Sequence, residues 1–293
     1  MNVKLGIYLN GEYAVGVTNS IGYHNFTQIA AITPTREVAE LPGPLRDAIE
    51  ERQVKERVAV ILSAIAPEQE AVLRMLHDLD EEEHRGTIYP GGRFRSVTSE
   101  WTVHTVLIGA GGDRAAFEAE RAINRFDPEV VLFVGVAGGI KDVSLGDVVV
   151  ATDIYGYESG KAADDFISRP HVGRSDFALE RRAERERQSS DWFEGPEPPA
   201  VVVAPIVAGA KVVASTRSLT YRFIRENYDQ AVAVEMEGAG FLEAAHANRS
   251  VRALVVRGIS DLLDDKETSD REGWQRRAAD HAARFAFHML SKI

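Results

Sequence analysis

The sequence predicts an α/β protein, and three features of the chain carry that prediction. From Arg57 onward, β-branched apolar runs alternate with amphipathic helical segments, which is the pattern of repeated strand-helix-strand units. The 293 residues suffice for one large α/β domain and a small accessory piece. Several apolar runs end in glycines or carboxylates, and ligands of α/β sheets gather where strands end. We therefore expect a functional site at the carboxyl ends of the strands.

Composition excludes several classes of function. Hydrophobic residues make up 44% of the chain and charged residues 27%, as in ordinary globular proteins. The formal net charge of −11 argues against a general nucleic-acid binder. The absence of cysteine excludes disulfides and thiolate chemistry. No apolar run reaches membrane-spanning length and the first residues lack a signal-peptide layout, so we expect a cytoplasmic protein without a membrane partner.

The first 55 residues are interpreted as a small accessory unit. Apolar residues alternate with polar ones on both sides of Asn10-Gly11, which is a strong β-hairpin signal. A proline-rich stretch then leads into a charged helical segment, residues 45–56. An extra edge hairpin of the main domain explains the same pattern equally well.

Residues 56–293 are expected to form the main α/β domain. The expected strands are residues 58–65, 93–97, 101–108, 130–134, 147–152, 201–207, 211–214, 231–234 and 253–256. The expected helices are residues 67–79, 113–126, 178–188, 219–226, 237–247 and 270–290. A charged insertion at about 160–199 interrupts the alternation. It is either a lid or interface element or a solvated surface helix.

Three acidic side chains follow three different expected strands. Glu237 opens a helix, where the helix dipole favours an ionised carboxylate whose two oxygens match the hydroxyls of a ribose diol. Asp261, beside Ser260, has apolar neighbours that can raise its pKa and make it a proton donor. Glu70 lies in the first turn after the first strand. Each alone is explained by capping or helix-start electrostatics, whereas the three together indicate a site.

Other motifs exclude the common cofactor enzymes. Residues 135–139 form a glycine-rich turn that lets backbone approach a ligand, but they do not match the dinucleotide fingerprint. No phosphate-binding GxxxxGK[ST] loop occurs, and the eight histidines do not form an HExxH motif. We therefore expect neither a nicotinamide-dependent enzyme nor a P-loop NTPase, and no histidine-bound metal.

Several segments resemble the purine nucleoside phosphorylase and nucleosidase superfamily. They are residues 233–238 (AVEMEG), 255–261 (VVRGISD), 130–150 (VVLFVGVAGGIKDVSLGDVVV), 63–72 (SAIAPEQEAV) and 205–215 (PIVAGAKVVAS). The likeness is greatest to 5′-methylthioadenosine/S-adenosylhomocysteine nucleosidases and runs from about Val58 to the C-terminus. It implies a phosphorylase-like three-layer α/β/α sandwich with a mixed central sheet, to which residues 1–55 add a β-hairpin/helix unit.

The resemblance also implies a reaction and a role for each carboxylate. The reaction is hydrolysis of the N-glycosidic bond of a purine nucleoside to free adenine, without a cofactor. Glu70 is expected to activate water, Asp261 to protonate purine N7, and Glu237 to accept the ribose hydroxyls beside Met236. The remaining expected substrate contacts are Glu235, Val136, Ala137, Gly138, Val212 and Ser260. A homo-oligomer is implied as well.

Two departures from the family pattern lie in the expected pocket. Val136 replaces a serine on the sugar side, and Val212 replaces an aromatic residue that stacks on the base. Phosphate-binding arginines are not evident, so hydrolysis is favoured over phosphorolysis. A phosphate-dependent phosphorylase remains one alternative, and a non-catalytic nucleotide sensor regulated by a partner through residues 1–55 is another.

A subgroup of nucleosidase domains associated with antiviral defence is also similar. The similar segments are residues 132–139, 149–160, 257–264 and 280–290. Some of these domains release adenine from ATP or other adenine nucleotides. That activity implies a polar, basic pocket around the ribose 5′ position, formed by Tyr155, Tyr157, Lys161 and Arg169.

Overall fold

The chain divides into two compact units, residues 1–55 and 56–293. A computed structural model describes residues 2–8, 12–18, 30–32, 57–97, 99–164, 166–248, 251–263, 269 and 272–293. In the smaller unit, strands β1 (Asn2–Tyr8), β2 (Glu12–Thr18) and β3 (Ala30–Ile32) pair antiparallel in that order. These strands agree with the predicted hairpin, while Asn10-Gly11 and the predicted helix at residues 45–56 lie outside the described residues.

The larger unit is built on one mixed ten-stranded sheet. Its strand order is β12-β9-β13-β14-β8-β4-β7-β6-β5, and the tenth strand, β15, pairs with both β8 and β9. The strands are β4 (Arg57–Ser63), β5 (His77–His84), β6 (Thr87–Arg95), β7 (Glu100–Leu107), β8 (Val130–Gly139), β9 (Val148–Gly156), β12 (His171–Arg174), β13 (Val201–Ala208), β14 (Ala233–Glu235) and β15 (Arg252–Asp261). Because β15 bridges β8 and β9, the pairings β9-β13-β14-β8-β15 close on themselves. This closure brings the ends of β8, β14 and β15 together.

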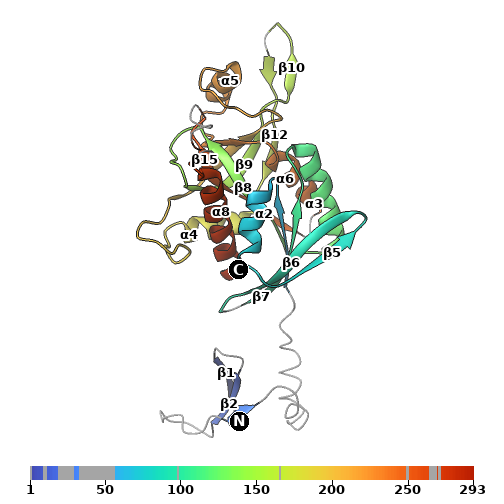
Figure 1. Ribbon diagram of the computed structural model, residues 1–293, viewed down its shortest axis with the longest axis vertical. Helices are drawn as coiled ribbons and strands as arrows, with labels where there is room; N and C mark the ends of the chain where they lie inside the picture. Colours follow the sequence, from blue (N-terminus) through green and yellow to red (C-terminus); the bar gives the residue numbers. More distant parts are fainter. Residues whose placement is uncertain are drawn as a thin grey trace. The chain divides into compact units, whose positions relative to one another are not determined.

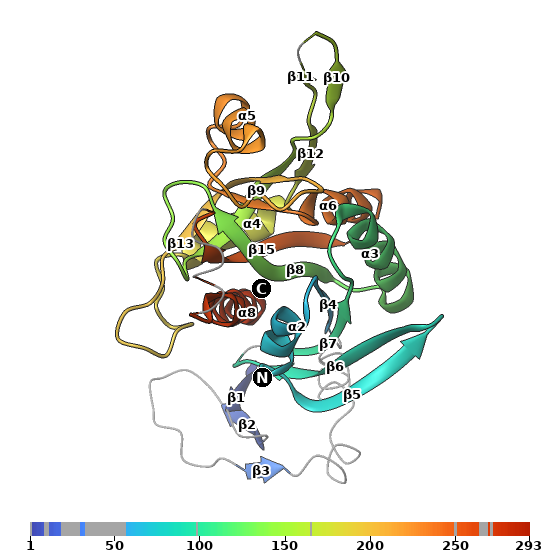
Figure 2. The ribbon, with the colours of Figure 1, turned by 45° about the horizontal axis from the view of Figure 1, so that its top comes forward.

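Helices cover both faces of the sheet (Figures 1 and 2). Helices α3 (Gly112–Phe126) and α6 (Gly238–Ala247) pack in one apolar cluster with the sheet. Helices α2 (Ala66–Leu73), α4 (Phe177–Glu186) and α8 (Trp274–Ser291) pack in a second cluster. The predicted three-layer α/β/α sandwich with a mixed sheet is therefore confirmed. None of the described helices is both long and apolar enough to cross a membrane.

The insertion contains more strand than the sequence predicted. After β9, residues Gly160–Ala162 (β10) and Phe166–Ser168 (β11) form a small antiparallel hairpin. Strand β12 then returns to pair with β9, and α4 follows at the predicted helical segment. Helix α5 (Leu219–Asn227) follows the loop after β13.

Two predicted elements differ from the structure. The helix expected over residues 67–79 ends at Leu73, and the charged run 77–84 is strand β5. The reason is a tight hairpin to β6, turned by Arg85 and Gly86 at φ values of 52° and 81°. Residues 211–214, expected as a strand, lie in a loop without regular secondary structure. Conversely, β8 and β15 run several residues beyond their predicted ends, through Gly139 and Asp261.

Candidate active site

A cavity of about 230 Å³ lies where β4, β8, β14 and β15 end. Strands β4 and β15 both run parallel to β8, so their carboxyl ends reach the same edge of the sheet. The cavity is lined by Ala64, Ile65, Glu68, Ala110, Val136, Ala137, Gly138, Lys211, Val212, Val213, Val234, Glu235, Met236, Glu237, Ser260 and Asp261. Its wall is therefore rich in carboxylates on an otherwise apolar surface.

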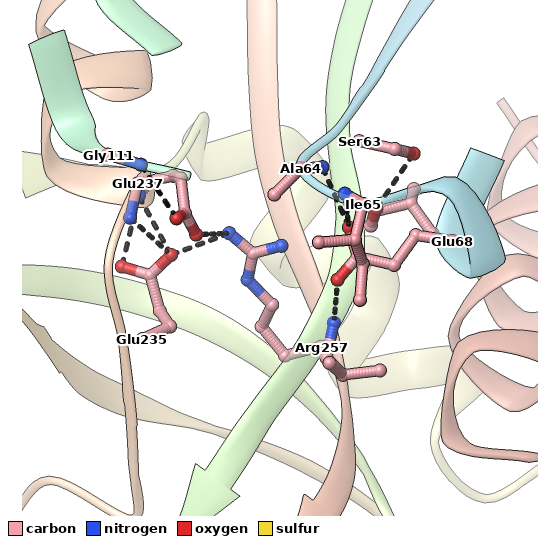
Figure 3. A network of polar contacts seen from close by, with 11 residues as sticks. Ser63, Ala64, Ile65, Glu68, Gly111, Glu235, Glu237 and Arg257 are labelled. Atoms are coloured by element: carbon pink, nitrogen blue, oxygen red, sulfur yellow. Dashed lines mark hydrogen bonds and ion pairs between the residues drawn. The ribbon is translucent and has the colours of Figure 1, made fainter. Parts of the chain in front are cut away.

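Glu68 is the carboxylate that the first strand and helix bring to the cavity. Its side chain is 2% exposed, and Oε2 accepts hydrogen bonds from the backbone N–H of Ala64 (2.7 Å) and Ile65 (3.1 Å). Its other oxygen, Oε1, accepts from Val136 N at 2.8 Å, across the sheet on β8 (Figure 3). Burial raises the pKa of Glu68, although the charge of Arg257 and the three amides oppose the rise. The carboxylate is thus fixed in position by backbone at both oxygens.

Glu70, the expected water-activating residue, is exposed and does not line the cavity. Two residues along an α-helix turn the side chain by about 200°, so Glu68 and Glu70 face opposite sides of α2. The buried positions Glu68, Ala71 and Val72 follow the i, i+3, i+4 spacing of an inward helix face. That spacing is the sequence signal that distinguishes the two glutamates, and it places Glu68, not Glu70, at the cavity.

Arg257 lies at the centre of the carboxylate cluster, and sequence reasoning missed it. Its side chain is fully buried, with Nη2 at 2.5 Å from Glu235 Oε2 and 3.7 Å from Glu237 Oε2. The guanidinium carbon stands 4.1 Å from the ring centre of Phe133. Among the described residues, neither Nε nor Nη1 of Arg257 has a hydrogen-bond partner. The missed signal was an arginine inside the apolar run of β15, where a charge is buried only with partners.

A glycine permits the approach of Arg257 to Glu68. A Cβ placed on Gly135 would come within 2.3 Å of Arg257 Nη1 and 2.6 Å of Glu68 Oε1. Any other residue there would force the two charged groups apart. Gly135 therefore serves side-chain packing of the charged cluster, rather than only the backbone approach to ligand that the sequence suggested.

Glu235 binds the start of α6 and holds Arg257. Its Oε2 accepts from the backbone N–H of Glu237 (3.0 Å) and Gly238 (2.8 Å), in addition to Arg257 Nη2. Glu235 borders the cavity, yet these donors occupy its carboxylate. Glu235 thus lines the cavity, as expected, with its carboxylate held by three donors of the protein itself.

Glu237 is the residue before α6, but it is not held ionised by the helix start as expected. The first amides of α6 are bound by Glu235, and Glu237 Oε1 instead accepts from Gly111 N at 3.0 Å. Burial raises the pKa of Glu237 to about 7, Arg257 opposes the rise, and the nearby charge of Glu235 adds to it. The Glu237 carboxyl group therefore titrates near neutral pH.

Asp261 closes the third side of the cavity, at the last residue of β15. It is 2% exposed; Oδ2 accepts from Ser260 Oγ at 3.0 Å and Oδ1 accepts from Leu263 N at 3.2 Å. Of its expected apolar neighbours, Ile259 and Leu263 are buried, whereas Leu262 is 38% exposed. The Asp261 carboxyl is thus oriented by its neighbours at the cavity edge.

The other predicted contacts divide into two groups. Val136, Ala137, Gly138, Met236 and Val212 line the cavity, with Val212 61% exposed at its opening. The residues proposed for a basic 5′ pocket are not among those lining it: Tyr155, Tyr157, Lys161 and Arg169. Within the described ranges, no group of three His, Asp or Glu side chains is placed to hold a metal ion.

Comparison with known proteins shows the family of this chain. The family model described as the Phosphorylase superfamily matches residues 57–291. The chain belongs to this superfamily. A 5′-methylthioadenosine/S-adenosylhomocysteine nucleosidase of Haemophilus ducreyi is 26% identical over 243 residues, covering 80% of this chain and 97% of the relative. A nucleosidase with the same name from Maridesulfovibrio salexigens is 24% identical over 242 residues, which cover 79% of this chain and 99% of the relative.

Solved structures of the superfamily share the fold. One is the 5′-methylthioadenosine/S-adenosylhomocysteine nucleosidase from Neisseria meningitidis, solved in complex with methylthio-immucillin-A. It superposes with a TM-score of 0.68 at 24% identity, and the match covers 81% of this chain and 100% of that chain. Futalosine hydrolase of Helicobacter pylori superposes with a TM-score of 0.68 at 22% identity, and the match covers 81% of this chain and 98% of that chain. Together the matches confirm the predicted relationship, and this superfamily member is an N-glycosyl hydrolase of the nucleosidase type.

Proposed function

We propose that the protein hydrolyses the N-glycosidic bond of an adenine nucleoside and releases free adenine. The observation that carries the proposal is the convergence of Glu68, Glu237 and Asp261 on one cavity from three separate strands. Breaking this bond requires a base for water, an acceptor for the ribose hydroxyls and a proton donor for the departing purine. The three carboxyl groups meet these three needs. The names of the relatives, which are nucleosidases for adenine-containing nucleosides, support the choice of base.

Glu68 is the proposed general base. Its raised pKa makes the ionised form a stronger base than an ordinary carboxylate. The water oxygen bonds to C1′ of the ribose while the C1′–N9 bond breaks, and the water proton passes to Glu68. Nη1 of Arg257, which lacks a hydrogen-bond partner among the described residues, lies close to the Glu68 carboxylate, and the charge of Arg257 favours the ionised form of Glu68. The bond electrons leave with the purine.

Asp261 and Glu237 are proposed to act on the two halves of the substrate. Asp261 donates a proton to N7 of the departing purine, with Ser260 fixing the orientation of its carboxyl group. Glu237, in its ionised form, accepts hydrogen bonds from the ribose hydroxyls, and Met236 packs against the sugar. Because each hydroxyl donates a hydrogen bond to a carboxylate oxygen, binding favours the ionised state of Glu237.

The charge on the cavity wall favours an uncharged nucleoside over a nucleotide. Of the described residues that line the cavity, Lys211 is the one cation, and its Nζ is paired with Glu158 Oε1 at 2.6 Å. Four carboxyl groups share the same wall. A phosphate, either on the ribose or as the attacking nucleophile, would meet repulsion there. We therefore expect water rather than phosphate as the attacking nucleophile, and methylthioadenosine-like nucleosides rather than AMP or ATP as the preferred substrates.

The decisive experiment is an adenine-release assay on the purified chain. The substrates are 5′-methylthioadenosine, S-adenosylhomocysteine, AMP and ATP, each with and without inorganic phosphate. We expect adenine release from the first two, independent of phosphate. Release that requires phosphate and yields a sugar 1-phosphate would identify a phosphorylase, and preferred cleavage of ATP would favour the defence-type activity. Nucleotide binding without product would support the sensor, and no release from any substrate contradicts the proposal.

We also propose that the enzyme is a cytoplasmic homo-oligomer with a regulatory partner that binds residues 1–55. The resemblance to the nucleosidases supports the oligomer. Light scattering of the purified chain tests it, and a monomer at assay concentration would contradict it. Comparing adenine release by the full chain with and without candidate partners, copurified from its source, tests the regulation.

A further inference from the structure

One wall of the cavity is a loop rather than a strand or helix. The pocket loop, residues 209–218 between β13 and α5, has no regular secondary structure, and its Lys211, Val212 and Val213 line the cavity. Val213 packs in the same apolar cluster as Leu263, two residues beyond Asp261. Under the proposed function, the loop is therefore the wall on the purine side of the site.

Two consecutive residues just before the insertion hold the beginning of this loop. The ring of Tyr157 lies against Gly209, where an added Cβ would come within 2.3 Å of Tyr157 Cζ. Both carboxylate oxygens of Glu158 bind the next two residues: Oε2 accepts from Ala210 N at 2.5 Å, and Oε1 pairs with Lys211 Nζ at 2.6 Å. Burial by itself would raise the pKa of Glu158, but the hydrogen bonds from Lys211 and Ala210 and the ammonium charge of Lys211 together lower it below its ordinary value. Glu158 is therefore ionised at neutral pH.

The far end of the loop is held by the same segment of the insertion. Helix α5 begins at Leu219, directly after the loop, and Phe223 of this helix meets Phe166 of β11 edge to face, with ring centres 5.4 Å apart. The hydroxyl groups of Ser168 and Tyr228 are hydrogen-bonded. Residues 157–168 thus contact both the start of the pocket loop and the helix that follows it.

We propose that Glu158 is a positioning residue that fixes the purine-side wall, so that the segment leading from β9 into the insertion sets the affinity for the base. This rests on the proposed function of the cavity. Glu158 does not line the cavity and touches no reacting group; it acts through Ala210 and Lys211. Its loss therefore weakens binding of the purine while the carboxyl groups that carry the chemistry stay in place.

The test compares Glu158→Gln with Glu158→Ala by adenine-binding calorimetry and by kcat and KM for 5′-methylthioadenosine. Glutamine keeps an acceptor for Ala210 N but loses the ion pair, whereas alanine loses both. We expect the adenine Kd and the KM to rise about threefold in the first and about tenfold in the second, with kcat within about twofold of wild type. Lys211→Met should match Glu158→Gln, and the two changes combined should add nothing further.

The matched control is Glu82→Gln. Glu82 Oε1 is paired with Arg125 Nε at 2.5 Å, with side-chain exposures of 35% and 42%, compared with 28% for Glu158 and 68% for Lys211. The control should leave KM, kcat and the adenine Kd unchanged. An unchanged adenine Kd in Glu158→Ala would overturn the positioning role, as would an equal fall of kcat and kcat/KM. Wild-type protein that binds adenine but releases none would refute the proposed reaction instead, and the binding comparison would still decide the role of Glu158.

Discussion

The sugar side and the purine side of the cavity are built in different ways. On the sugar side, Glu68, Glu235 and Arg257 are buried. The two glutamates accept hydrogen bonds from backbone N–H groups just before α2, on β8 and at the start of α6, and Glu235 is also paired with Arg257. On the purine side, Val212 and Lys211 are exposed on a loop that Glu158 holds. Buried charge must be matched closely by partners, whereas an exposed loop tolerates change at small cost. We therefore expect substitutions of the buried carboxyl groups to abolish function and substitutions in the exposed pocket loop to tune it.

The largest effect is expected from Glu68→Gln. Glutamine keeps the size of the side chain but cannot take the water proton, so kcat should fall by about 10²–10⁴-fold. The matched control is Glu70→Gln, two residues along the same helix and exposed, which should keep nearly full activity. Steady-state adenine release measures both. The opposite result, with Glu70→Gln inactive and Glu68→Gln active, would restore the assignment made from sequence.

Asp261→Asn should be nearly as damaging for a purine substrate, because asparagine cannot protonate N7. A fall of about 10²–10³-fold in kcat is expected with 5′-methylthioadenosine. A riboside with nitrophenol as leaving group needs no proton, so the same variant should lose much less activity with it. Equal losses for both leaving groups would show that Asp261 acts in some way other than as a proton donor.

Arg257→Met should reduce stability more than any other single change in the cluster. It leaves Glu235, Glu237 and Glu68 buried without their shared cation, at a cost of about 3–5 kcal/mol in the free energy of unfolding. Urea unfolding at pH 8 measures the loss. Lowering the pH should recover part of it, because protonation removes the unpaired charges. Stability close to wild type at pH 8 would mean that the carboxyl groups do not depend on Arg257.

Glu237→Gln should change how stability depends on pH. The pKa of Glu237 is raised to about 7 in the folded protein from 4.5, so its contribution is present below pH 4.5 and lost as pH rises through 7. Because glutamine does not titrate, the variant does not lose stability over this range. Its free energy of unfolding should therefore increase by roughly 3 kcal/mol relative to wild type between pH 4.5 and 8. Unfolding curves across that range measure the difference. A difference in stability between the variant and wild type that does not vary with pH would contradict the raised pKa. In a separate measurement, wild-type kcat/KM should rise through about pH 7 as Glu237 ionises.

The sequence predicted the sandwich and a site where strands end, but not which carboxylate faces inward on α2 or which cation joins the cluster. Strand-helix alternation and carboxylates at strand ends depend on local patterns that are visible in one chain. Arg257 belongs to the cluster through Glu235, twenty-two residues away, and through Gly135 on β8. Such contacts depend on how β15 registers against β8, which no local pattern encodes. The β5–β6 hairpin was missed because charged β5 has no apolar alternation.

The smallest effect, and the clearest gain of function, is expected from Val212→Phe. Val212 lines the cavity and is 61% exposed, so the opening has room for a larger side chain without rearranging the core. An aromatic ring there can stack on the purine, which contributes on the order of 1 kcal/mol at an exposed site, equivalent to about fivefold in affinity. KM for 5′-methylthioadenosine and the adenine Kd should both fall by that factor while kcat stays within about twofold. Val212→Leu adds volume without a π-face and is the matched control. Equal gains for leucine and phenylalanine would assign the effect to apolar contact, and a loss for both would show that the purine-side wall is as closely packed as the sugar side, which would remove the contrast between them.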